Sequence, residues 1–357
     1  MSRRRDRHTP ITPKTDDPVF HCHERTQMHF LTEKDVKQAL AGRATAREAV
    51  QVIEQVLKQQ SEGSTYHLKR YTMTHPQHPG HLWHNVRILP GMVPGMGAAA
   101  VRVYSGYRGT NRSEVICLFD WSSMEMVAII SDYHLHAIRT ASPYGVAAKH
   151  LAKQESTTLG IIGTGRYARG MAQAVCAVRP IRRIKVYSRD PANVRNFCDV
   201  MHQALEIEVS PAASGREAVK NTDIMITATS GNTIVFEGSW LEPGALYMSL
   251  APGECDEETV LRSRVFLSGS EQVLGDNPPR KPFDTLLAGK KFKPEDVAAE
   301  FCDVVAGKKP GRQSDEEILF YESPGMGILD AGIGHWVFNR AVQQGLGTKL
   351  PFGEEEP

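Results

Sequence analysis

Two absences narrow the class of protein at once. The sequence has six cysteines in 357 residues, and they form neither a CxxC pair nor a short repeated spacing. This pattern is typical of free thiols in a reducing compartment. The sequence also has no apolar run of about 18 residues, the length that a membrane-spanning helix needs. We therefore expect a cytoplasmic protein with no membrane partner.

An excess of charge of one sign is missing as well. Lysine and arginine number 42 and aspartate and glutamate 41, which leaves a net charge of +1. This balance indicates neither a nucleic acid nor an anionic membrane as the main partner. A chain of 357 residues is long enough for two domains, each with its own apolar core. Residues 1–19 are basic and then rich in proline and aspartate, and we expect them to form a disordered arm.

Hydrophobic periodicity predicts helices and then a sheet in the first part of the chain. Thr32 is expected to cap a first helix, and a second helix is expected over residues 45–60. The buried face of the second helix is predicted to carry Ala49, Ile53, Val56 and Leu57. Short alternating runs between Thr65 and Met126, separated by proline and glycine, predict an antiparallel sheet.

From residue 158 onward the pattern changes to alternating strands and helices. This alternation predicts a parallel sheet with helices on both faces. The expected fold class is therefore α/β, with a doubly wound Rossmann domain over residues 141–319. A second, α+β domain is expected from residues 20–140 and 320–352, since the helix near the C-terminus can pack back onto the N-terminal part.

A glycine-rich turn, GTGRYA, opens the predicted Rossmann domain. Gly163, Gly165 and Ala168 form the pattern G-x-G-x-x-A between an apolar strand and a helix. The first glycine permits a tight turn, the second lets backbone N–H groups approach a pyrophosphate, and the small third residue lets helix and strand pack closely. With Thr164, Arg166 and Tyr167, these residues are the predicted pyrophosphate site. The alternative is a turn that merely connects strand to helix.

The end of the next predicted strand indicates which dinucleotide is bound. An NAD site usually has an acidic residue there, whereas an NADP site offers arginine or serine to the 2′-phosphate. This sequence has Ser188 and Arg189, followed by Asp190. NADP(H) is therefore favoured and NAD(H) stays possible, because Arg189 can also be a solvated surface charge while Asp190 turns back to the ribose.

Three segments together resemble the ornithine cyclodeaminase and mu-crystallin family. They are HLHAIRTASPYGVAAKHLA, LGIIGTGRYA and GRQSDEEILFYESPGMGILDAGIG, and the resemblance extends from about Thr32 to Phe352. It implies a homodimer in which residues 20–140 and 320–352 bind substrate and dimerise, with the Rossmann domain between them. It also implies hydride transfer between a nicotinamide and the α-carbon of an amino acid or its imine.

The resemblance also assigns roles to basic residues. Arg139 matches the family arginine that binds the substrate carboxylate, and Thr140 beside it would lie near the nicotinamide. A guanidinium suits this role because its planar fork grips a carboxylate with two hydrogen bonds; a surface ion pair is the alternative. Arg102 stands where the family has a lysine, and arginine keeps the charge but cannot deprotonate near neutral pH. Arg70 matches a further arginine, with Lys69 equally possible.

Further candidate site residues come from the late part of the chain and from one histidine. Thr229 follows a Rossmann strand and is expected at the cofactor. The loop predicted to close over the nicotinamide consists of Ser323, Pro324 and Gly325. Asp330 matches an acid at the start of the last helix, where it can also be only a helix cap. His84 is a candidate proton donor.

One family residue is missing. Cyclodeaminases carry an aspartate in a turn after a late Rossmann strand, where it handles the amine during ring closure. Here Ser249, Leu250 and Ala251 stand at that place. Glu254 and Asp256 are expected to point to solvent because the loop is short, and the alternative is that one of them replaces the aspartate. Elimination and cyclisation would lose their acid–base group, whereas hydride transfer would remain.

The favoured function is therefore an NADP(H)-dependent ketimine reductase, or amino-acid dehydrogenase in reverse. The resemblance supports this choice, because mu-crystallin, the ketimine reductase of the family, also lacks the aspartate. Two alternatives remain open. One is a cyclodeaminase-type ammonia lyase that uses NAD catalytically, and the other is a non-catalytic NADPH-binding protein. The substrate would be a small amino or imino acid.

The predicted sheet region also contains a cluster of histidines and a cluster of arginines. The spacing of His75, His78, His81 and His84 would suit a metal on a helix, but the intervening prolines preclude one, and we expect no metal site. The region is also basic, with Arg70, Arg87, Arg102 and Arg108. This favours a dicarboxylic substrate, although solvated arginines would give the same pattern.

Overall fold

The computed structural model describes residues 27–42, 45–74, 85–105, 113–230 and 233–351. The predicted N-terminal arm, the histidine-rich segment with His84, and Arg108 lie outside these residues. Within the described ranges, no helix has both the length and the apolar character needed to cross a bilayer.

The first sheet confirms the antiparallel arrangement predicted for the early strands. Its order is β16-β1-β7-β6-β5-β4-β2, and β3 also pairs with β4. Neighbours from β4 to β7 are antiparallel, while β1 runs parallel to β7. The strands are β1 (Met28–Leu31), β2 (Tyr66–His67), β3 (Tyr71–Thr74), β4 (Asn85–Val93), β5 (Ala98–Ser105), β6 (Glu114–Asp120), β7 (Met126–Ser131) and β16 (Thr348–Leu350).

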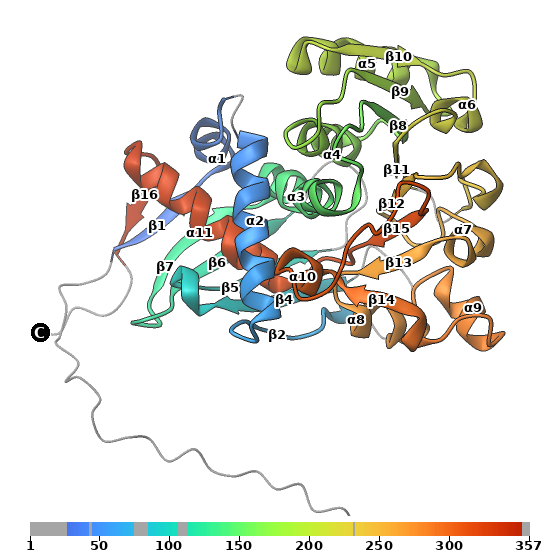
Figure 1. The fold of residues 1–357 in the computed structure, drawn as a ribbon. Helices are drawn as coiled ribbons and strands as arrows, with labels where there is room; N and C mark the ends of the chain where they lie inside the picture. The colour runs from blue at the N-terminus through green and yellow to red at the C-terminus, as the bar shows by residue number, and fades with distance from the viewer. Residues whose placement is uncertain (1–26, 43–44, 75–84, 106–112, 231–232, 352–357) are drawn as a thin grey trace, which may run out of the picture.

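Helices pack on this sheet as the periodicity predicts. Thr32 caps α1 (Glu33–Ala39), since its hydroxyl accepts from the Asp35 N–H at 3.3 Å. The predicted apolar face of α2 (Thr45–Ser61) is fully buried. The late helix α11 (Gly327–Gln343) packs against α2, β4 and β5, so it completes the domain formed by the early part of the chain (Figure 1).

The second sheet confirms the predicted parallel Rossmann fold. Its order is β10-β9-β8-β11-β12-β15-β13-β14, and every neighbouring pair is parallel. The strands are β8 (Thr158–Ile162), β9 (Arg183–Tyr187), β10 (Glu208–Pro211), β11 (Ile224–Thr227), β12 (Leu246–Ser249), β13 (Arg264–Leu267), β14 (Val297–Glu300) and β15 (Leu319–Glu322). The strand order reverses between β8 and β11, which is where such sheets bind ligands.

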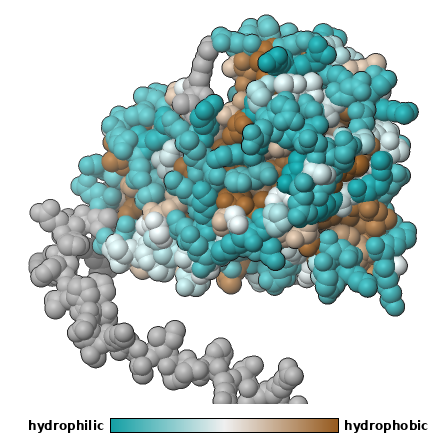
Figure 2. All heavy atoms as spheres, in the orientation of Figure 1, coloured by the Kyte–Doolittle hydropathy of each residue, from teal (hydrophilic) through white to brown (hydrophobic). Residues whose placement is uncertain are grey.

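The crossover connections of the parallel sheet contain helices of very different length. They are α4 (Arg166–Cys176), α5 (Pro191–Leu205), α6 (Gly215–Val219), α7 (Glu257–Leu261), α8 (Ser270–Leu274), α9 (Phe283–Ala288) and α10 (Phe301–Val305). The longest, α4 and α5, flank the strands β8 and β9, where the glycine turn lies. Hydrophilic residues cover most of the face seen in Figure 2, with smaller hydrophobic areas between them.

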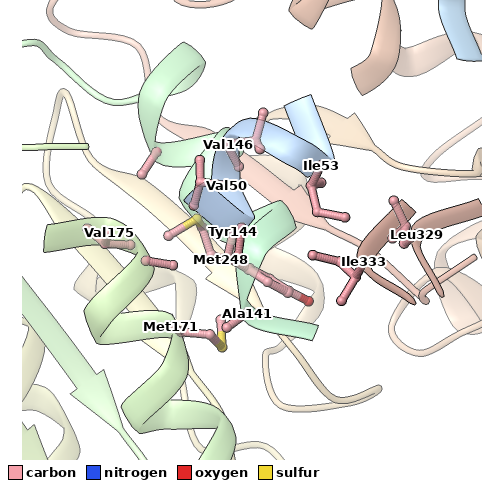
Figure 3. Close-up of a cluster of buried hydrophobic side chains, with 14 of the residues drawn as sticks. Val50, Ile53, Ala141, Tyr144, Val146, Met171, Val175, Met248, Leu329 and Ile333 are labelled. Atoms are coloured by element: carbon pink, nitrogen blue, oxygen red, sulfur yellow. The ribbon is translucent and has the colours of Figure 1, made fainter. Parts of the chain in front are cut away.

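The helix α3 (Tyr133–Leu151) connects the two sheets and shares a core with both. Figure 3 shows Ala141 and Tyr144 of α3 beside Ile53 of α2, Met171 of α4 and Met248 of β12. Position 141 lies inside α3, and β15 keeps residues 319–322 in the parallel sheet, so the chain returns to the first domain after it.

Candidate active site

A groove of about 1260 Å³ lies at the carboxyl ends of β8, β9 and β11. It is bordered by the glycine turn, by the end of β9 and by the residues that follow β11. The predicted cofactor residues that line it are Gly163, Thr164, Gly165, Arg166, Tyr167, Ser188, Arg189 and Thr229. Ala168 is fully buried below the turn, as a helix packed closely on β8 requires.

The groove has the features that a dinucleotide needs. Gly163 has a φ of +122°, and a Cβ there would lie 2.2 Å from the Ala228 carbonyl oxygen, so no other residue fits. A Cβ on Gly165 would meet nothing within 4 Å, which leaves the N-terminus of α4 open to a phosphate. The Thr229 hydroxyl in the groove is buried without a hydrogen-bond partner among the described residues, so it has a donor and an acceptor available for a bound group.

The acid at the end of β9 is already engaged. Asp190 caps α5: its Oδ1 accepts from the Ala192 N–H at 2.8 Å, and its Oδ2 accepts from the Asn193 side chain at 2.8 Å. Both carboxylate oxygens therefore have partners inside their own turn. Arg189 lines the groove beside it and forms no ion pair with the residues that the structure describes.

A second cavity, of about 400 Å³, lies between the two domains. Tyr167 and Thr229 line both this cavity and the groove, so the two spaces adjoin. The cavity brings together the predicted residues Arg70, Arg102, Arg139, Thr140, Ser323, Pro324 and Gly325. Several other residues that line the cavity had no site role predicted from the sequence. They are Tyr104, Ser105, Glu114, His136, Pro143, residues 250–252, Arg280 and Leu329, and Arg87 was noted only as part of a basic region.

Arg139 and Asp330 form a buried pair at the floor of this cavity. Arg139 Nε lies 2.5 Å from Oδ1 of Asp330, and Nη2 lies 2.8 Å from Oδ2. Asp330 lies beyond Met326, the N-cap of α11, so it is not the helix cap that the sequence allowed. The Asp330 carboxylate therefore makes the bidentate contact with Arg139 that was expected for the substrate. Nη1 is the nitrogen of Arg139 that has no partner among the described residues. Gly325, with a φ of +80°, lies against this nitrogen, and a Cβ there would be 2.8 Å away.

Arg102 is the centre of an acidic network. It is 1% exposed, donates to Glu114 Oε2 at 2.7 Å and pairs with Asp132. Burial, together with the nearby Asp330, raises the pKa of Asp132 to about 7, although Arg102 acts against this. Glu114, Asp132 and His136 offer a spacing that suits a metal, but the Arg102 guanidinium binds all three. The Arg102 guanidinium thus takes the place that a metal ion would have among these three groups.

His136 is the clearest site residue that the sequence analysis missed. It precedes Arg139 by three positions on α3 and so shares its helix face. Its Nδ1 lies 2.9 Å from Glu114 Oε2 and 3.2 Å from the Tyr167 hydroxyl. Arg102 Nη2 lies 3.0 Å from the same nitrogen, so the carboxylate and the guanidinium together hold the ring in place, as in histidines that transfer protons. The signal available in the sequence was the place of His136 three residues before Arg139, one helical turn away.

Tyr104 lies among the arginines of the cavity. The Arg102 guanidinium carbon lies 4.0 Å from the centre of its ring and that of Arg87 lies 5.6 Å away. Burial alone would raise the pKa of Tyr104, but the charges of Arg70, Arg102 and Arg87 lower it. Arg87 of β4 and Arg102 of β5 thus line the cavity beside this ring.

The expectation for Glu254 was wrong. It is fully buried rather than solvated, and its two carboxylate oxygens accept from the backbone N–H groups of Thr229 and Ala251 at 2.6 and 2.8 Å. Asp256 caps α7 instead of facing the cavity. Both acids accept hydrogen bonds from backbone N–H groups. For Glu254 this is necessary, because a fully buried carboxylate needs donors on each oxygen. The loop after β12 thus presents Leu250, Ala251 and Pro252 to the cavity and no acid.

Comparison with known proteins agrees with this architecture. The model of the ornithine cyclodeaminase/mu-crystallin family matches residues 28–345. The chain belongs to this family, as its motifs indicated.

Named relatives of the chain include reductases and dehydrogenases. A Delta(1)-pyrroline-2-carboxylate reductase of Bacillus cereus is 29% identical over 278 residues, which are 74% of this chain and 84% of the relative. An N-((2S)-2-amino-2-carboxyethyl)-L-glutamate dehydrogenase of Staphylococcus aureus is 27% identical over 91% of this chain and 98% of its own. The solved structure of Thermococcus litoralis Delta(1)-pyrroline-2-carboxylate reductase, in complex with NADH and L-proline, is 29% identical. It superposes with a TM-score of 0.81 over 90% of this chain and all of that chain.

Proposed function

We propose that the protein is an NADP(H)-dependent oxidoreductase that reduces a ketimine, a C=N bond next to a carboxylate, to an amino acid, or catalyses the reverse. The observation that carries this proposal is the junction of the dinucleotide groove with the arginine-lined cavity at Tyr167 and Thr229. The relatives named as imine reductases and amino-acid dehydrogenases support it.

Different residues of the cavity bind the substrate and transfer the proton. The free Nη1 atoms of Arg139 and Arg102 hold the substrate carboxylate, and their buried acids keep both guanidinium groups fixed. When bound, the dinucleotide supplies the hydride that the imine carbon accepts. His136, oriented by Glu114, gives a proton to the imine nitrogen. Leu329, Pro143 and Leu250 form apolar parts of the wall and keep water from the reacting carbon.

The preference for NADP(H) rests on the end of β9. The 2′-phosphate would meet Ser188 and Arg189, while Asp190, engaged as a helix cap, is not free to bind the ribose hydroxyls. NAD(H), which is bound in the Thermococcus litoralis structure, is the alternative cofactor.

The further proposals concern assembly and location. Large apolar side chains on and beside β2 and β3 are exposed, with Tyr66 60%, Leu68 71%, Tyr71 62% and Met73 46% accessible. Such a patch is suited to burial in a homodimer. The free buried thiols agree with a cytoplasmic location.

The test is NADPH oxidation with a panel of cyclic and linear ketimines, run beside ammonia release from ornithine with NAD. Turnover of a ketimine and silence with ornithine would support the reductase. Ammonia release without net cofactor change would favour the lyase, whose amine-handling acid the loop after β12 does not supply. NADPH binding without any turnover would favour a non-catalytic binding protein.

A further inference from the structure

We propose that the cavity contains a second anion-binding position, formed by Arg87 with Arg70, so that the substrate is an imino acid with a second acidic group on its side chain. This inference rests on the proposed function and names its substrate class. It concerns a position separate from the one where Arg139 and Arg102 hold the first carboxylate.

The first observation is how the cavity arginines are paired. Arg102 is neutralised by Asp132 and Glu114, Arg139 by Asp330, and Arg280 by Glu322. Arg70 and Arg87 face the same cavity, and neither forms an ion pair with a carboxylate in the part of the chain that the structure describes. The two sequence segments that flank β4 and β5, residues 75–84 and 106–112, contain no aspartate or glutamate. Among the described residues, two cations therefore face the cavity without a carboxylate counter-ion.

The second observation is that Arg70 directly precedes β3, and β3 pairs with β4, which carries Arg87. The register of this pair sets Thr72 opposite Arg87. Arg70 Nη2 donates to the Pro324 carbonyl oxygen at 2.7 Å, which fixes the side chain against the closing loop. Its Nε is buried and has no partner among the described residues. A buried guanidinium N–H without an acceptor is costly, and a carboxylate oxygen would satisfy it.

The electrostatic environment favours an anion at this position. Burial lowers the pKa of Arg70, and the positive charges of Arg139, Arg87 and Arg102 lower it further. These four arginines repel one another, and an anion bound near them lowers the electrostatic free energy of the group. Tyr104 lines the same cavity, where the guanidinium carbons of Arg102 and Arg87 lie 4.0 and 5.6 Å from the centre of its ring.

The size of the cavity suits a small molecule with two acidic groups. About 400 Å³ is at the lower end of the range for ligand pockets. A linear imino dicarboxylate of four or five carbons therefore fits the space and the charges better than a long diamine. A cationic side chain such as that of ornithine would meet uncompensated arginine charge, which is strongly unfavourable in a desolvated pocket.

The experiment compares substrates that differ in the second carboxylate alone. Imines formed in place from ammonia with oxaloacetate or 2-oxoglutarate are compared with those from pyruvate or 2-oxobutyrate, with NADPH and separately with NADH. The wild type is expected to prefer the dicarboxylic imines by at least about tenfold in kcat/KM. Arg87→Gln is expected to lose about 100-fold with the dicarboxylic imines and to change less than about threefold with the monocarboxylic ones, while Arg87→Lys retains part of the preference. Arg182→Gln, an exposed arginine at the start of β9, is the matched control and should behave as wild type.

A binding measurement separates this inference from the proposed function. Calorimetry with succinate and glutarate, against butyrate and pentanoate, is run on wild type and Arg87→Gln with NADPH present. Tighter binding of the diacids, lost in Arg87→Gln, would support the anion position even if no imine were reduced, in which case the proposed reaction alone would fail. Equal binding of mono- and diacids, or a preference unchanged by Arg87→Gln, would overturn the second anion position while leaving imine reduction intact.

Discussion

The dinucleotide groove and the arginine-lined cavity are built in opposite ways. The groove comes from short contiguous segments at the ends of adjacent parallel strands, where glycine backbone and helix N-terminus do most of the binding. The cavity takes single residues from positions as distant as 70 and 329. They lie on the first sheet, on helices, and in the loops that follow strands of the second sheet. A site built from backbone geometry can therefore be predicted from a short sequence motif. A site built from paired charges cannot, because its residues are far apart in the sequence.

The largest expected effect belongs to the cavity. Replacement of Arg139 by glutamine leaves Asp330 buried beside Arg102 with one cation fewer, and it removes a proposed carboxylate contact. We expect kcat/KM for ketimine reduction to fall by about 10³-fold or more, since the loss of a buried charged partner costs about 3–5 kcal/mol.

Initial rates and thermal melting check this prediction together. Arg139→Lys keeps the charge but not the fork, and it should melt closer to wild type than Arg139→Gln while still losing most activity. Wild-type kinetics in either variant would show that the pair is purely structural.

Alanine substitutions at two glycines of the groove should distinguish an effect on folding from an effect on dinucleotide binding. Gly163→Ala introduces a Cβ 2.2 Å from the Ala228 carbonyl at a φ of +122°, so we expect a lower melting temperature and no measurable dinucleotide binding. Gly165→Ala meets no protein atom within 4 Å, so it should fold normally but weaken dinucleotide binding by about tenfold or more, because its methyl group enters the space of the pyrophosphate.

Melting curves and quenching of intrinsic fluorescence by NADPH provide the two readouts. If Gly165→Ala bound NADPH as well as the wild type, the groove would not be the pyrophosphate site.

A smaller effect concerns the choice of cofactor at the end of β9. Arg189→Ser removes the proposed 2′-phosphate contact, and we expect the preference for NADPH over NADH to fall by about tenfold, mainly through KM for NADPH. Arg195→Gln, an exposed arginine on α5, provides the control for net charge. An unchanged ratio would make Arg189 a surface charge and leave the discrimination elsewhere.

The smallest effect tests packing remote from both sites. Glu54 of α2 accepts from Lys149 and lies 2.9 Å from His150 Nε2, both on α3, and these hydrogen bonds lower its pKa from 4.5 to about 2. A depressed carboxylate pKa adds stability above pH 4.5, and this is lost as the pH falls from 4.5 towards 2. Glu54→Gln should therefore cost about 2 kcal/mol at pH 7 and show a weaker acid dependence.

Denaturant unfolding at several pH values measures this contribution. Parallel pH profiles for wild type and Glu54→Gln would contradict the assignment. Dinucleotide binding should remain unchanged in the variant, because Glu54 contacts neither the groove nor the cavity.

The sequence by itself determined the parts of the molecule that depend on local geometry. The G-x-G-x-x-A turn, the capping of α1 by Thr32, the apolar face of α2 and the strand–helix alternation all follow from rules that act over a few residues, and the structure has them where they were predicted. The matches of Arg139, Arg102 and Arg70 to one site came from family resemblance, and the structure brings these three together.

Tertiary structure alone decided which charges pair. Asp330 was expected as a possible cap and instead binds Arg139, and Glu254 was expected in solvent and instead holds two loops from a fully buried position. His136 became a site residue only because β6 brings Glu114 to it. Sequence spacing fixes which side chains share a face, but the free energy of a charge depends on the dielectric and the partners around it, and these exist only once the two sheets and α3 have packed together.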